Sequence, residues 1–326
     1  MAGTQTGPVV VFGGSGFVGR HIVRRLAKDG FNLRVVVRRP NEALFLKTAG
    51  RTGQIELVQG NIRDEASSRS ALAGASAIIN AVGILYEAGP QKFDAVQSAG
   101  AARLAALAAE LGIDRFIQIS AIGADAGSAS AYARSKAEGE DAILAACPQA
   151  HILRPSIVVG PEDDFFNRFA TMAQIAPALP LIGGGLTRYQ PVSVFDVAQA
   201  VAACLAHAPS GVYELGGPQI YSFRELMELM LDKIDKRRVL VPLPFAAAGM
   251  LAQFARVLPK PPLTPDQVIL LRSDNVVGEN MPDLAVREGK WKLLCNFDGS
   301  DPQLYNMQTD RAEKVNQAAA RPAVTK

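Results

Sequence analysis

An apolar run that breaks into glycines near the start of the chain constrains the fold more than any other feature. The run VVVF at 9–12 leads into GGSGFVG at 13–19 and then into a helical pattern through Leu26. Four large apolar residues in a row are typical of a strand buried on both faces. Glycines at 13, 16 and 19 permit a sharp turn, close approach of the backbone to a pyrophosphate, and close packing of the helix. The segment predicts a dinucleotide-binding turn whose helix N-terminus faces the phosphates.

Alternating strand and helix patterns continue through the first half of the chain. Further strands are predicted at 33–37, 55–62, 77–82, 115–119 and 150–159, the last broken at Arg154-Pro155. Helices are predicted between them at 17–28, 65–72 and 92–111, and again around Tyr132. Strands that alternate with helices form a parallel sheet with right-handed crossovers. The predicted fold is therefore an α/β, doubly wound, Rossmann-type sheet with ligands at the carboxyl ends of its strands.

The end of the second predicted strand bears on the choice of nicotinamide cofactor. In NAD-selective sites an acidic residue about twenty positions after the glycines binds the ribose 2′-hydroxyl, whereas a cationic side chain there accommodates a 2′-phosphate. Arg38 follows Gly19 by 19 residues. The position favours NADP(H), with NAD(H) as the alternative cofactor. The other interpretation of Arg38 is a solvated charge in a loop.

Two further loops lie at the predicted carboxyl edge of the sheet. Asp64, after the third strand, is a candidate for an adenine contact and equally for the N-cap of the helix at 65–72. The fourth strand ends in Ala81, Val82 and Gly83, and the missing side chain of Gly83 would let the backbone pass close to the cofactor. These loops extend the predicted cofactor site beyond the glycine turn.

The fifth predicted strand precedes residues that can carry acid–base chemistry. Ser120 ends the strand, and Tyr132 and Lys136 stand four residues apart on one face of the helix that follows. A nearby ammonium lowers the pKa of a phenol from its usual value near 10, so that Tyr132 could donate or accept a proton. A serine hydroxyl can hold the substrate oxygen. These three residues form the predicted catalytic group.

Composition narrows the classes of function. The chain has 326 residues, a formal charge of +3 and no long block of Lys or Arg, so we expect no nucleic-acid partner. Cys147, Cys204 and Cys295 form no CxxC or Cys/His cluster, which argues against a metal site and a disulfide framework. We expect no signal peptide, because no basic segment precedes the first strand, and no membrane-spanning stretch.

The pattern becomes less regular after about residue 160. We predict a dinucleotide-binding domain at 1–160 with 186–216, and a smaller C-terminal region at 161–185 with 217–277. A separate tail is predicted at 278–326. Helices with N-terminal capping signals recur in the smaller region, as in a substrate-type domain.

Two later features leave alternatives open. An apolar helix at 243–258 needs cover, which its own domain, a partner protein or a lipid surface could supply. Asp196 begins a helix through Ala206, either as its N-terminal anchor or as a substrate contact. The anchoring role is the favoured interpretation of Asp196.

Together these motifs resemble those of the extended or atypical short-chain dehydrogenase/reductases. The residues that carry the resemblance are the glycine turn at 13–19, Ser120, Tyr132 with Lys136, and Arg154-Pro155-Ser156. Residues 8 to about 277 are more closely similar to one branch, the NAD(P)-binding accessory subunit of respiratory complex I and its bacterial homologues. The matching stretches are SAIGAD at 120–125, AYARSKAEGE at 131–140, LIGGG at 181–185, QPV at 190–192 and LRSDNVV at 271–277.

The resemblance implies a tightly held NADPH with a structural or assembly role on the peripheral arm of NADH:quinone oxidoreductase. It implies a place on the cytoplasmic face of the bacterial inner membrane, or on the matrix side in a mitochondrion. The implied contacts are Gly13, Ser15, Gly16, Phe17 and Val18 with the phosphates, Arg38 and Arg39 with the 2′-phosphate, Asn61 and Ile62 with the adenine side, and Tyr132 and Lys136 with the nicotinamide ribose. Asn61 departs from the pattern of such folds, in which an aspartate is common at this position.

The tail resembles a different family. The stretches AVREGKWKLL at 285–294 and DPQLYN at 301–306, followed by Thr309-Asp310 and by 313–316, are similar to the C-terminal segment of sulfatases. No Cys-x-Pro-x-Arg signature accompanies them, so we expect no sulfatase activity. We interpret the junction near Gly278 as the mark of a gene fusion, of a recombination event or of an error in sequence assembly. Without its usual host core, the tail is expected to be poorly ordered apart from strands at about 290–295 and 303–307.

Two functions therefore compete. As an accessory subunit, the chain would bind NADPH, peripheral-arm subunits of complex I and the adjoining membrane surface without robust turnover. As an active NADP-dependent reductase, epimerase or dehydratase, it would use Tyr132 as acid–base, Lys136 as electrostatic support and Ser120 as oxygen anchor. The motifs alone do not separate the two, because Tyr and Lys side chains can hold a ribose without moving a proton.

Overall fold

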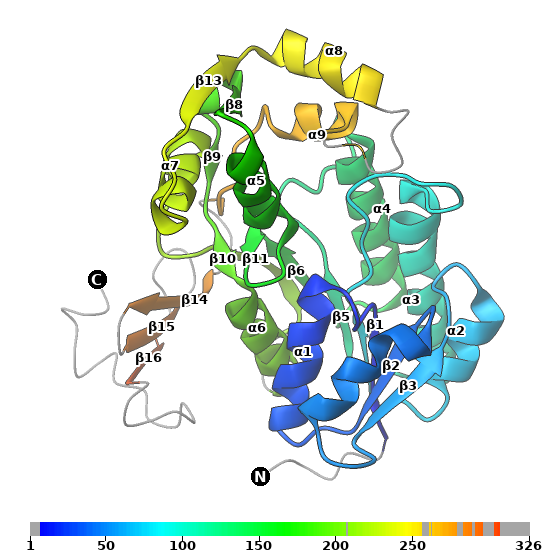
Figure 1. The fold of residues 1–326 in the computed structure, drawn as a ribbon. Helices are drawn as coiled ribbons and strands as arrows, with labels where there is room; N and C mark the ends of the chain where they lie inside the picture. Colours follow the sequence, from blue (N-terminus) through cyan, green and yellow to red (C-terminus); the bar gives the residue numbers. More distant parts are fainter. Residues whose placement is uncertain are drawn as a thin grey trace.

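The computed structural model describes residues 7–206, 208–255, 261 and 263–278, together with the backbone of three strands between residues 283 and 306. In these residues the chain forms a sheet of mostly parallel strands covered by helices, with a smaller region over one end of the strands (Figure 1). The predicted α/β, doubly wound fold is confirmed.

Seven parallel strands form the main part of the sheet, in the order β3-β2-β1-β4-β5-β6-β11. Their bounds are β1 (Val9–Phe12), β2 (Leu33–Val37), β3 (Ile55–Gln59), β4 (Ala77–Asn80), β5 (Phe116–Ile119), β6 (His151–Pro155) and β11 (Gly211–Leu215). The strand order reverses between β1 and β4, and open α/β sheets bind ligands at such a switch point. The glycine turn after β1 and the loop after β4 therefore flank the expected cofactor position.

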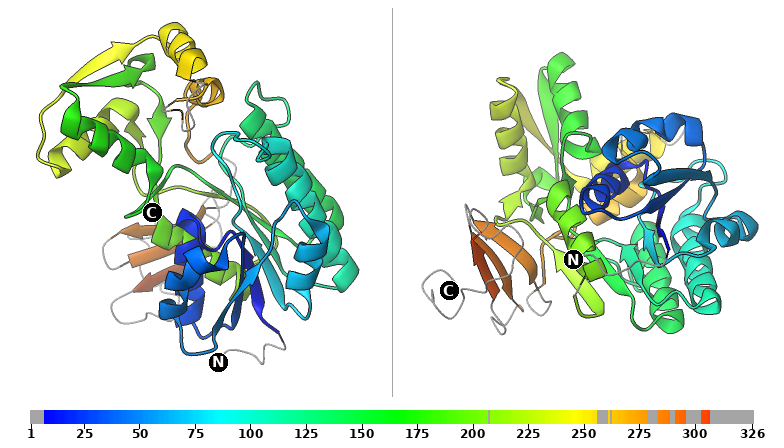
Figure 2. Two further views of the ribbon diagram at one scale, coloured as in Figure 1. Left: turned by 45° about the vertical axis from the view of Figure 1, so that its right-hand side comes forward. Right: turned by 90° about the horizontal axis from the view of Figure 1, so that it is seen from below.

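Helices cover both faces of this sheet (Figure 2). The helices of one face are α1 (Phe17–Lys28) and α6 (Val194–Ala206), and those of the other are α2 (Glu65–Leu72), α3 (Ala99–Leu111) and α4 (Ala131–Ala146). In β1, Val9 and Val11 pack toward α1 and α6, whereas Val10 and Phe12 pack toward the opposite face. Burial on both faces thus explains why this strand is apolar throughout.

The smaller region has its own buried cluster. Its elements are α5 (Asp164–Ile175), β8 (Ala178–Ile182), η3 (Gly183–Gly185), α7 (Phe223–Lys233), β13 (Val239–Leu243), α8 (Phe245–Ala255) and α9 (Pro265–Leu270). Leu179 and Leu181 of β8 pack against Phe223, Leu226 and Met227 of α7. Two short pairs complete this part of the chain, β7 (Val158–Val159) with β10 (Val192–Ser193) and β9 (Arg188–Tyr189) with β12 (Tyr221–Ser222).

Several predicted boundaries shift in the structure. The third strand ends at Gln59 rather than at residue 62, because Asn61 Oδ1 accepts the N–H of Arg63 and turns the chain. The helix predicted at 92–111 begins with a π-helical turn, η2 (Asp94–Ser98), before α3. The parallel pairing of β8 with β13 was not predicted, because the two strands are far apart in the sequence and pair only in the folded chain.

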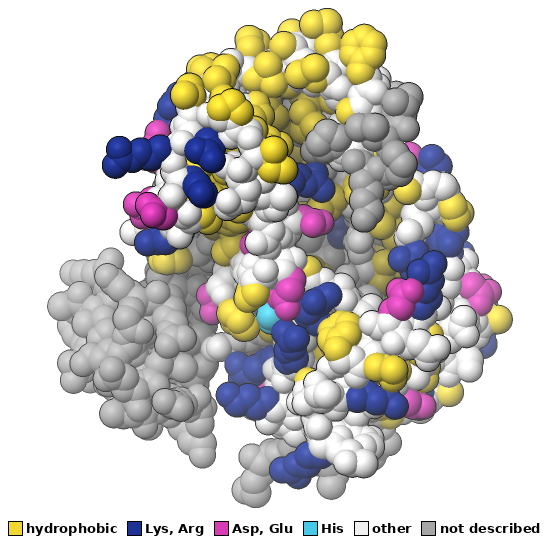
Figure 3. Space-filling model, in the orientation of Figure 1, with side chains coloured by type: hydrophobic (Ala, Val, Ile, Leu, Met, Phe, Trp, Pro, Cys, Tyr) yellow, Lys and Arg dark blue, Asp and Glu magenta, His cyan; other side chains and the backbone are white. Residues whose placement is uncertain are grey.

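The predicted apolar helix corresponds to α8, which packs on one side only. Ala248 and Ala252 are buried with Val268 of α9, whereas Met250 and Phe254 are 63% and 78% exposed. Figure 3 shows apolar side chains gathered on this upper surface. Packing within its own region therefore covers one face of α8 and leaves the other exposed in the described part of the chain. No helix described there, α8 included, is long and apolar enough to cross a membrane.

Three strands of the tail are described by their backbone, β14 (Asp283–Glu288), β15 (Trp291–Cys295) and β16 (Gln303–Asn306). They pair antiparallel with one another, and β14 joins the edge of the main sheet through a single parallel pairing of Asp283 with Glu214. The two strands predicted in the tail correspond to β15 and β16, whereas β14 was not predicted. The rest of the sulfatase-like segment, with its expected poor order, lies outside the described residues.

Candidate functional site

The glycine turn forms the start of α1 at the carboxyl end of β1. Gly16 is the N-cap of α1, and no side chain caps this end of the helix. The first N–H groups of α1 are therefore available to a ligand, with the positive end of the helix dipole behind them. The structure brings the predicted phosphate contacts Gly13, Ser15, Gly16, Phe17 and Val18 together in this one turn.

Close packing explains the glycines of the turn. Gly13 has φ +78°, and a Cβ there would lie 2.9 Å from the backbone carbonyl of Ala81. A Cβ on Gly19 would lie 2.2 Å from the carbonyl oxygen of Gly13. Gly14, which the sequence analysis did not single out, is equally constrained, since its Cβ would lie 2.4 Å from a side chain of β2. Gly16 is less crowded, with its nearest contact at 3.2 Å.

Two arginines follow β2, and both are exposed. Arg39 Nη1 lies 2.9 Å from Oε1 of Glu42 in the 3₁₀ segment η1 (Pro40–Ala49). Arg38 makes no hydrogen bond or ion pair with another described residue. The two arginines, together with Gln59, line an open hollow of about 330 Å³ at the ends of β2 and β3. The free guanidinium of Arg38 fits an anionic group in this hollow.

On the adenine side, the structure decides between the two interpretations of Asp64. Its Oδ2 accepts the N–H of Ser67 at 3.0 Å, so Asp64 is the N-cap of α2, and hydrogen bonds from Ser67 lower its pKa. Ile62 is buried in the core against Gly100 of α3. Because Asn61 uses Oδ1 within the turn, contacts of Asn61 and Ile62 with an adenine would come from an amide nitrogen or from the backbone.

The loop after β4 borders the glycine turn. The N–H of Ala81 donates to Phe12 O at 3.0 Å, and the N–H of Val82 donates to Asn80 Oδ1 at 3.2 Å. Gly83 is exposed, and a Cβ there would lie 3.5 Å from Lys136 Nζ. The loop thus lies beside both the glycine turn and Lys136 of α4.

Tyr132 and Lys136 lie in the first two turns of α4, with 5.8 Å between Lys136 Nζ and the centroid of the Tyr132 ring. The prediction that they share a helix face is confirmed. Lys136 is buried and donates to Ile119 O at 3.2 Å. Burial lowers its pKa to about 8, and Glu140 acts in the opposite direction. Because an ammonium has three N–H donors, Lys136 can also donate to a ligand.

The pKa of Tyr132 differs from the expectation. Burial raises it to about 12, and the Asp266 carboxylate adds to the rise. The predicted lowering by Lys136 was wrong, because burial of the phenolate and the charge of Asp266 outweigh the neighbouring ammonium. At neutral pH the phenol is protonated, so it is suited to donate a proton rather than to accept one.

Ser120 bonds inward, away from the role predicted for it. Its hydroxyl donates to Oε1 of Glu140. Glu140 is 3% exposed and is bound by Arg154, whose Nη2 lies 2.5 Å from Glu140 Oε2. A hydroxyl has one proton, so Ser120 cannot donate to a substrate oxygen while this bond is made. The sequence did not single out Glu140, because it is one of three acidic residues in the same helix, with Glu138 and Asp141.

A carboxylate of the smaller region holds the start of α4. Asp266 accepts hydrogen bonds from Ala131 N at 2.7 Å, Tyr132 N at 3.2 Å and Ser130 Oγ at 2.8 Å. Negative charge at a helix N-terminus is stabilising. The sequence indicated only that Asp266 belongs to the first turn of its own helix, since nothing local points to a partner more than 130 residues away.

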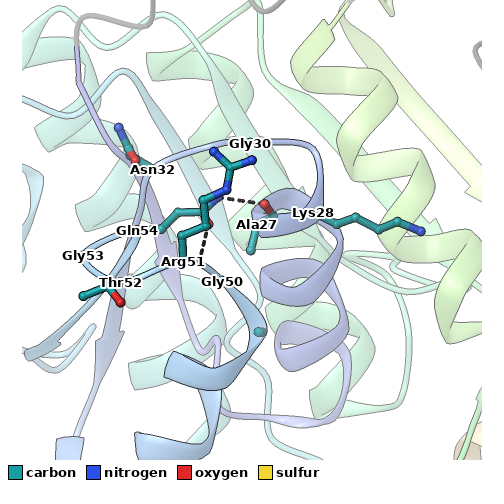
Figure 4. A pocket seen from close by; sticks show the side chains of 10 residues that line it. Ala27, Lys28, Gly30, Asn32, Gly50, Arg51, Thr52, Gly53 and Gln54 are labelled. Atoms are coloured by element: carbon teal, nitrogen blue, oxygen red, sulfur yellow. Dashed lines mark hydrogen bonds between the residues drawn. The ribbon is translucent and has the colours of Figure 1, made fainter.

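A larger hollow, of about 550 Å³, lies at the other end of the sheet (Figure 4). It is lined at the amino ends of β2 and β3 by Lys28, Asn32 and Arg51 among others. Gln54 also lines this hollow, and its Nε2 donates to Ala27 O at 2.7 Å. Because the glycine turn and α4 stand at the carboxyl ends of the strands, this hollow is separate from the predicted cofactor site.

Two observations fit a dinucleotide at the carboxyl edge. One is the uncapped, glycine-lined N-terminus of α1. The other is a buried acceptor without a partner, Gln97 Oε1, beside Gly83 and Lys136. Gln97 was not predicted, since nothing in its local pattern distinguishes it from other helical polar residues. In the described ranges no three His, Cys, Asp or Glu side chains are placed to hold a metal ion.

Comparisons with solved structures agree with this architecture. The dTDP-glucose 4,6-dehydratase from Bacillus anthracis str. Ames in complex with NAD matches with TM-score 0.63 and 20% identity, over 73% of this chain and 84% of that one. The UDP-glucose 4-epimerase of Thermus thermophilus in complex with NAD matches with TM-score 0.60 and 20% identity, over 83% and 94%. At such identities the likeness establishes the fold.

Comparisons by sequence include relatives named as complex I subunits and a relative named as a reductase. The NADH dehydrogenase [ubiquinone] 1 alpha subcomplex subunit 9 of Arabidopsis thaliana is 38% identical, over 83% of this chain and 71% of that protein. The NADH-ubiquinone oxidoreductase 40 kDa subunit of Neurospora crassa is 31% identical, over 70% of this chain and 60% of that protein. A ceramide reductase of Caulobacter vibrioides is 33% identical, over 75% and 76%.

These relatives confirm the resemblance to complex I subunits. The model of the NAD dependent epimerase/dehydratase family matches residues 9–216, from β1 to the end of β11. That range holds the glycine turn, the serine, tyrosine and lysine, and seven parallel strands. With more than half of its length matched, this chain belongs to the NAD dependent epimerase/dehydratase family.

Proposed function

We propose that this chain is an NADP(H)-binding accessory subunit of NADH:quinone oxidoreductase, in which the cofactor serves structure or assembly rather than turnover. One observation carries the proposal: no side chain caps the glycine-lined start of α1, whereas the hydroxyl of Ser120 is bonded to Glu140. The relatives named as complex I subunits support an association with complex I, and the partners that we propose are subunits of its peripheral arm.

The proposed preference for NADP(H) rests on Arg38, whose guanidinium has no partner among the described side chains. Arg38→Ala should weaken NADPH binding about tenfold to a hundredfold, the value of a charge-assisted hydrogen bond, and change NADH binding little. Titration of nicotinamide fluorescence measures both affinities. Arg51→Ala, in the hollow at the opposite edge, is the control and should change neither. Equal losses for NADPH and NADH would contradict a 2′-phosphate contact of Arg38.

We further propose that the protein lies against the membrane beside complex I, on the cytoplasmic face in a bacterium or on the matrix side in a mitochondrion. The supporting feature is an exposed apolar surface on β13 and α8 (Figure 3), formed by Val239, Val241, Met250, Leu251 and Phe254. Contiguous apolar side chains of this kind mark contact sites. Met250→Ser with Phe254→Ser should release the protein from membranes and leave NADPH binding unchanged.

The assembly role is tested by co-purification. The tagged intact chain, and a form truncated after Val277, are captured from solubilised membranes of the source cell and assayed for NADH:quinone oxidoreductase subunits and bound nucleotide. We expect both forms to retain these subunits and NADP(H). Retention by the truncated form alone would show that the tail blocks assembly. Nucleotide-loaded protein without such subunits in either form would contradict the proposal.

An active reductase is the second candidate, favoured by the protonated phenol of Tyr132 and by the ceramide reductase among the relatives. In that reaction a bound carbonyl would take a hydride from NADPH at carbon and a proton from Tyr132 Oη at oxygen, giving an alcohol. Turnover of NADPH with a panel of long-chain ketones tests this role. If the protein is a reductase, the wild type should turn over NADPH with one of these ketones. Tyr132→Phe should abolish this activity and still bind NADPH.

A further inference from the structure

The connection from β6 to the smaller region runs past the start of α1. It leaves β6 at Pro155 and enters α5 after Asp163, the N-cap of that helix. The strands β5 and β4 lie between β6 and β1 in the sheet. A connection that reaches from the end of β6 to the helix after β1 therefore spans the carboxyl edge of the sheet, where the nucleotide is proposed to bind. We call its last four residues, 160–163, the strap.

Two residues of the strap lie against α1. A Cβ placed on Gly160 would lie 3.2 Å from Cε2 of Phe17 and 2.6 Å from Cγ1 of Val194 in α6, so the strap backbone touches both helices. Glu162 Oε2 lies 2.8 Å from Nε2 of His21, which is buried one turn after Phe17. The strap is therefore attached to the same turns of α1 that follow the glycines.

The attachment through Glu162 is ionic and partly exposed. Its Oε1 lies 3.5 Å from Arg20 Nη1 and 3.6 Å from Arg24 Nη1. The hydrogen bond with His21 and the charges of the two arginines lower the pKa of Glu162, so the carboxylate is ionised at neutral pH. The side chain of Glu162 is 32% exposed. Because water already reaches this carboxylate, its release from α1 costs far less than the release of a buried ion would.

The glycine turn has supports of its own that do not involve the strap. Arg20 Nε donates to Gly16 O at 3.2 Å, and its Nη2 donates to Ser15 O at 3.1 Å. These bonds join residues within one turn of chain, so they persist when Glu162 moves away. The strap can therefore leave α1 while the phosphate-binding turn keeps its geometry.

We propose that the strap closes over the nucleotide beside the start of α1, and that the contacts of Glu162 with His21, Arg20 and Arg24 are the latch that keeps it closed. The inference rests on the proposed binding of NADP(H) at this edge. The nucleotide enters and leaves while the latch is open, and a closed strap gives the slow exchange that suits a cofactor retained for structure or assembly.

A latch of this kind has a kinetic signature. Its contacts are made within the protein, so they are the same with and without nucleotide. Weakening them raises the open fraction of both forms by the same factor. Association and dissociation should therefore become faster together, and the Kd should stay unchanged. Loss of a contact with the bound nucleotide would instead raise the dissociation rate and the Kd together.

Stopped-flow fluorescence of the nicotinamide on the full chain measures both rates. Association is followed on mixing with NADPH, and dissociation on displacement of bound NADPH by excess NADP⁺. Glu162→Gln keeps the size of the side chain and an acceptor for His21, and removes the charge. We expect both rate constants to rise about fivefold, the value of a partly exposed ionic contact, at an unchanged Kd.

Two further variants check the origin of the effect. Glu162→Ala also removes the acceptor of His21, so both rates should rise more than in Glu162→Gln. Glu56→Gln removes the same charge from an ion pair with Arg34, 2.7 Å long, in the strands β3 and β2. This control should leave both rates unchanged.

Each other outcome overturns the inference. Unchanged rates in Glu162→Gln would mean that the strap does not gate exchange. Faster dissociation with an equal rise in Kd would make Glu162 a support of the bound state. Faster association with slower dissociation would be electrostatic attraction of the anionic nucleotide, as would equal changes in Glu56→Gln. These results leave NADPH binding by the wild type intact, whereas a wild type that binds neither NADPH nor NADH would overturn the proposed function as well.

Discussion

The glycine turn and the serine–tyrosine–lysine group stand at the same edge of one sheet but are held in different ways. The turn is built largely from neighbours in the sequence, with Gly19 packed on the carbonyl of Gly13. The second group is held by residues from distant elements. Arg154 of β6 binds Glu140, which accepts the hydrogen bond of the Ser120 hydroxyl, and Asp266 of α9 binds the first turn of α4.

The first group is therefore arranged to bind a ligand, whereas the second is partly committed to bonds within the protein. The turn keeps its N–H groups free for a ligand, because no side chain caps α1. In the second group the hydroxyl of Ser120 is already bonded within the protein, and the pKa of Tyr132 is raised rather than lowered. Of the two hydroxyls, the one on Ser120 is therefore unavailable as a donor to a substrate oxygen, whereas the phenol of Tyr132 keeps its proton. Four substitutions test whether the two groups are held in these different ways.

Loss of the turn should have the largest effect. Gly13→Ala places a Cβ 2.9 Å from the Ala81 carbonyl at a backbone φ of +78°. Overpacking and a left-handed residue together should lower the free energy of unfolding by about 2–4 kcal/mol. Calorimetry should show no measurable NADPH binding, because the carbonyl and the turn cannot both keep their places. Gly249→Ala in α8, with open space around it, should match the wild type in binding. NADPH binding by Gly13→Ala with wild-type affinity would remove the turn from the cofactor site.

Substitution of Glu140 tests whether its buried pair with Arg154 holds Ser120 in place. Glu140→Ala leaves the guanidinium of Arg154, 21% exposed, with only the more distant carboxylate of Glu214, whose Oε1 lies 4.0 Å from Arg154 Nη1. Breaking such a pair costs about 3–5 kcal/mol, and the partial exposure of Arg154 favours the lower end of this range. Urea unfolding measures the change. Glu138→Ala, on the exposed side of the same helix, should change stability by less than about 0.5 kcal/mol. A small effect for both would show that the pair does not hold Ser120 in place.

Asp266 tests whether the smaller region controls α4. Asp266→Ala removes three hydrogen bonds from the helix start and should destabilise the protein by about 2 kcal/mol in thermal unfolding. Asp266→Asn should also lower the pKa of Tyr132 below its value of about 12, because the nearby negative charge is gone while burial stays. Spectrophotometric titration reads this pKa by difference from the same chain with Tyr132→Phe. An unchanged pKa would separate Asp266 from the phenol. Asp232→Ala on the surface of α7 is the control.

Substitution of Lys136 should change the stability of the protein least, and it should increase it. Its pKa is lowered from 10.5 to about 8 by burial, so below pH 8 the folded protein bears a poorly solvated charge. Lys136→Met should therefore stabilise the nucleotide-free protein at pH 6–7 by about 1 kcal/mol, after loss of the bond to Ile119 O. Between pH 8 and 10.5 the unfolded chain binds more protons than the folded one, so the stability of the wild type rises and the gap narrows. A gap that widens with pH would contradict this assignment.

Local patterns determined most of the dinucleotide-binding half. The helices at Phe17–Lys28 and Glu65–Leu72 and the strand at Leu33–Val37 were predicted with the bounds that the structure shows. Their signals are short-range: apolar periodicity, a capping side chain such as Asp64, and glycines that only a tight turn requires. The parallel sheet follows from the alternation of these elements, because crossover connections leave few other arrangements.

Which groups of the site meet depends on contacts between elements that are far apart in the sequence. The proton of Ser120 could not be assigned without Glu140 and Arg154, and Asp266 reaches Tyr132 from a helix of the smaller region. Likewise, only the folded chain shows that the side-chain oxygen of Gln97 has no hydrogen-bond partner and lies beside Gly83. The sequence determines what each side chain can donate or accept, whereas burial and distant neighbours determine what it does. That is why the fold and the cofactor turn were predicted, while the pKa of Tyr132 was not.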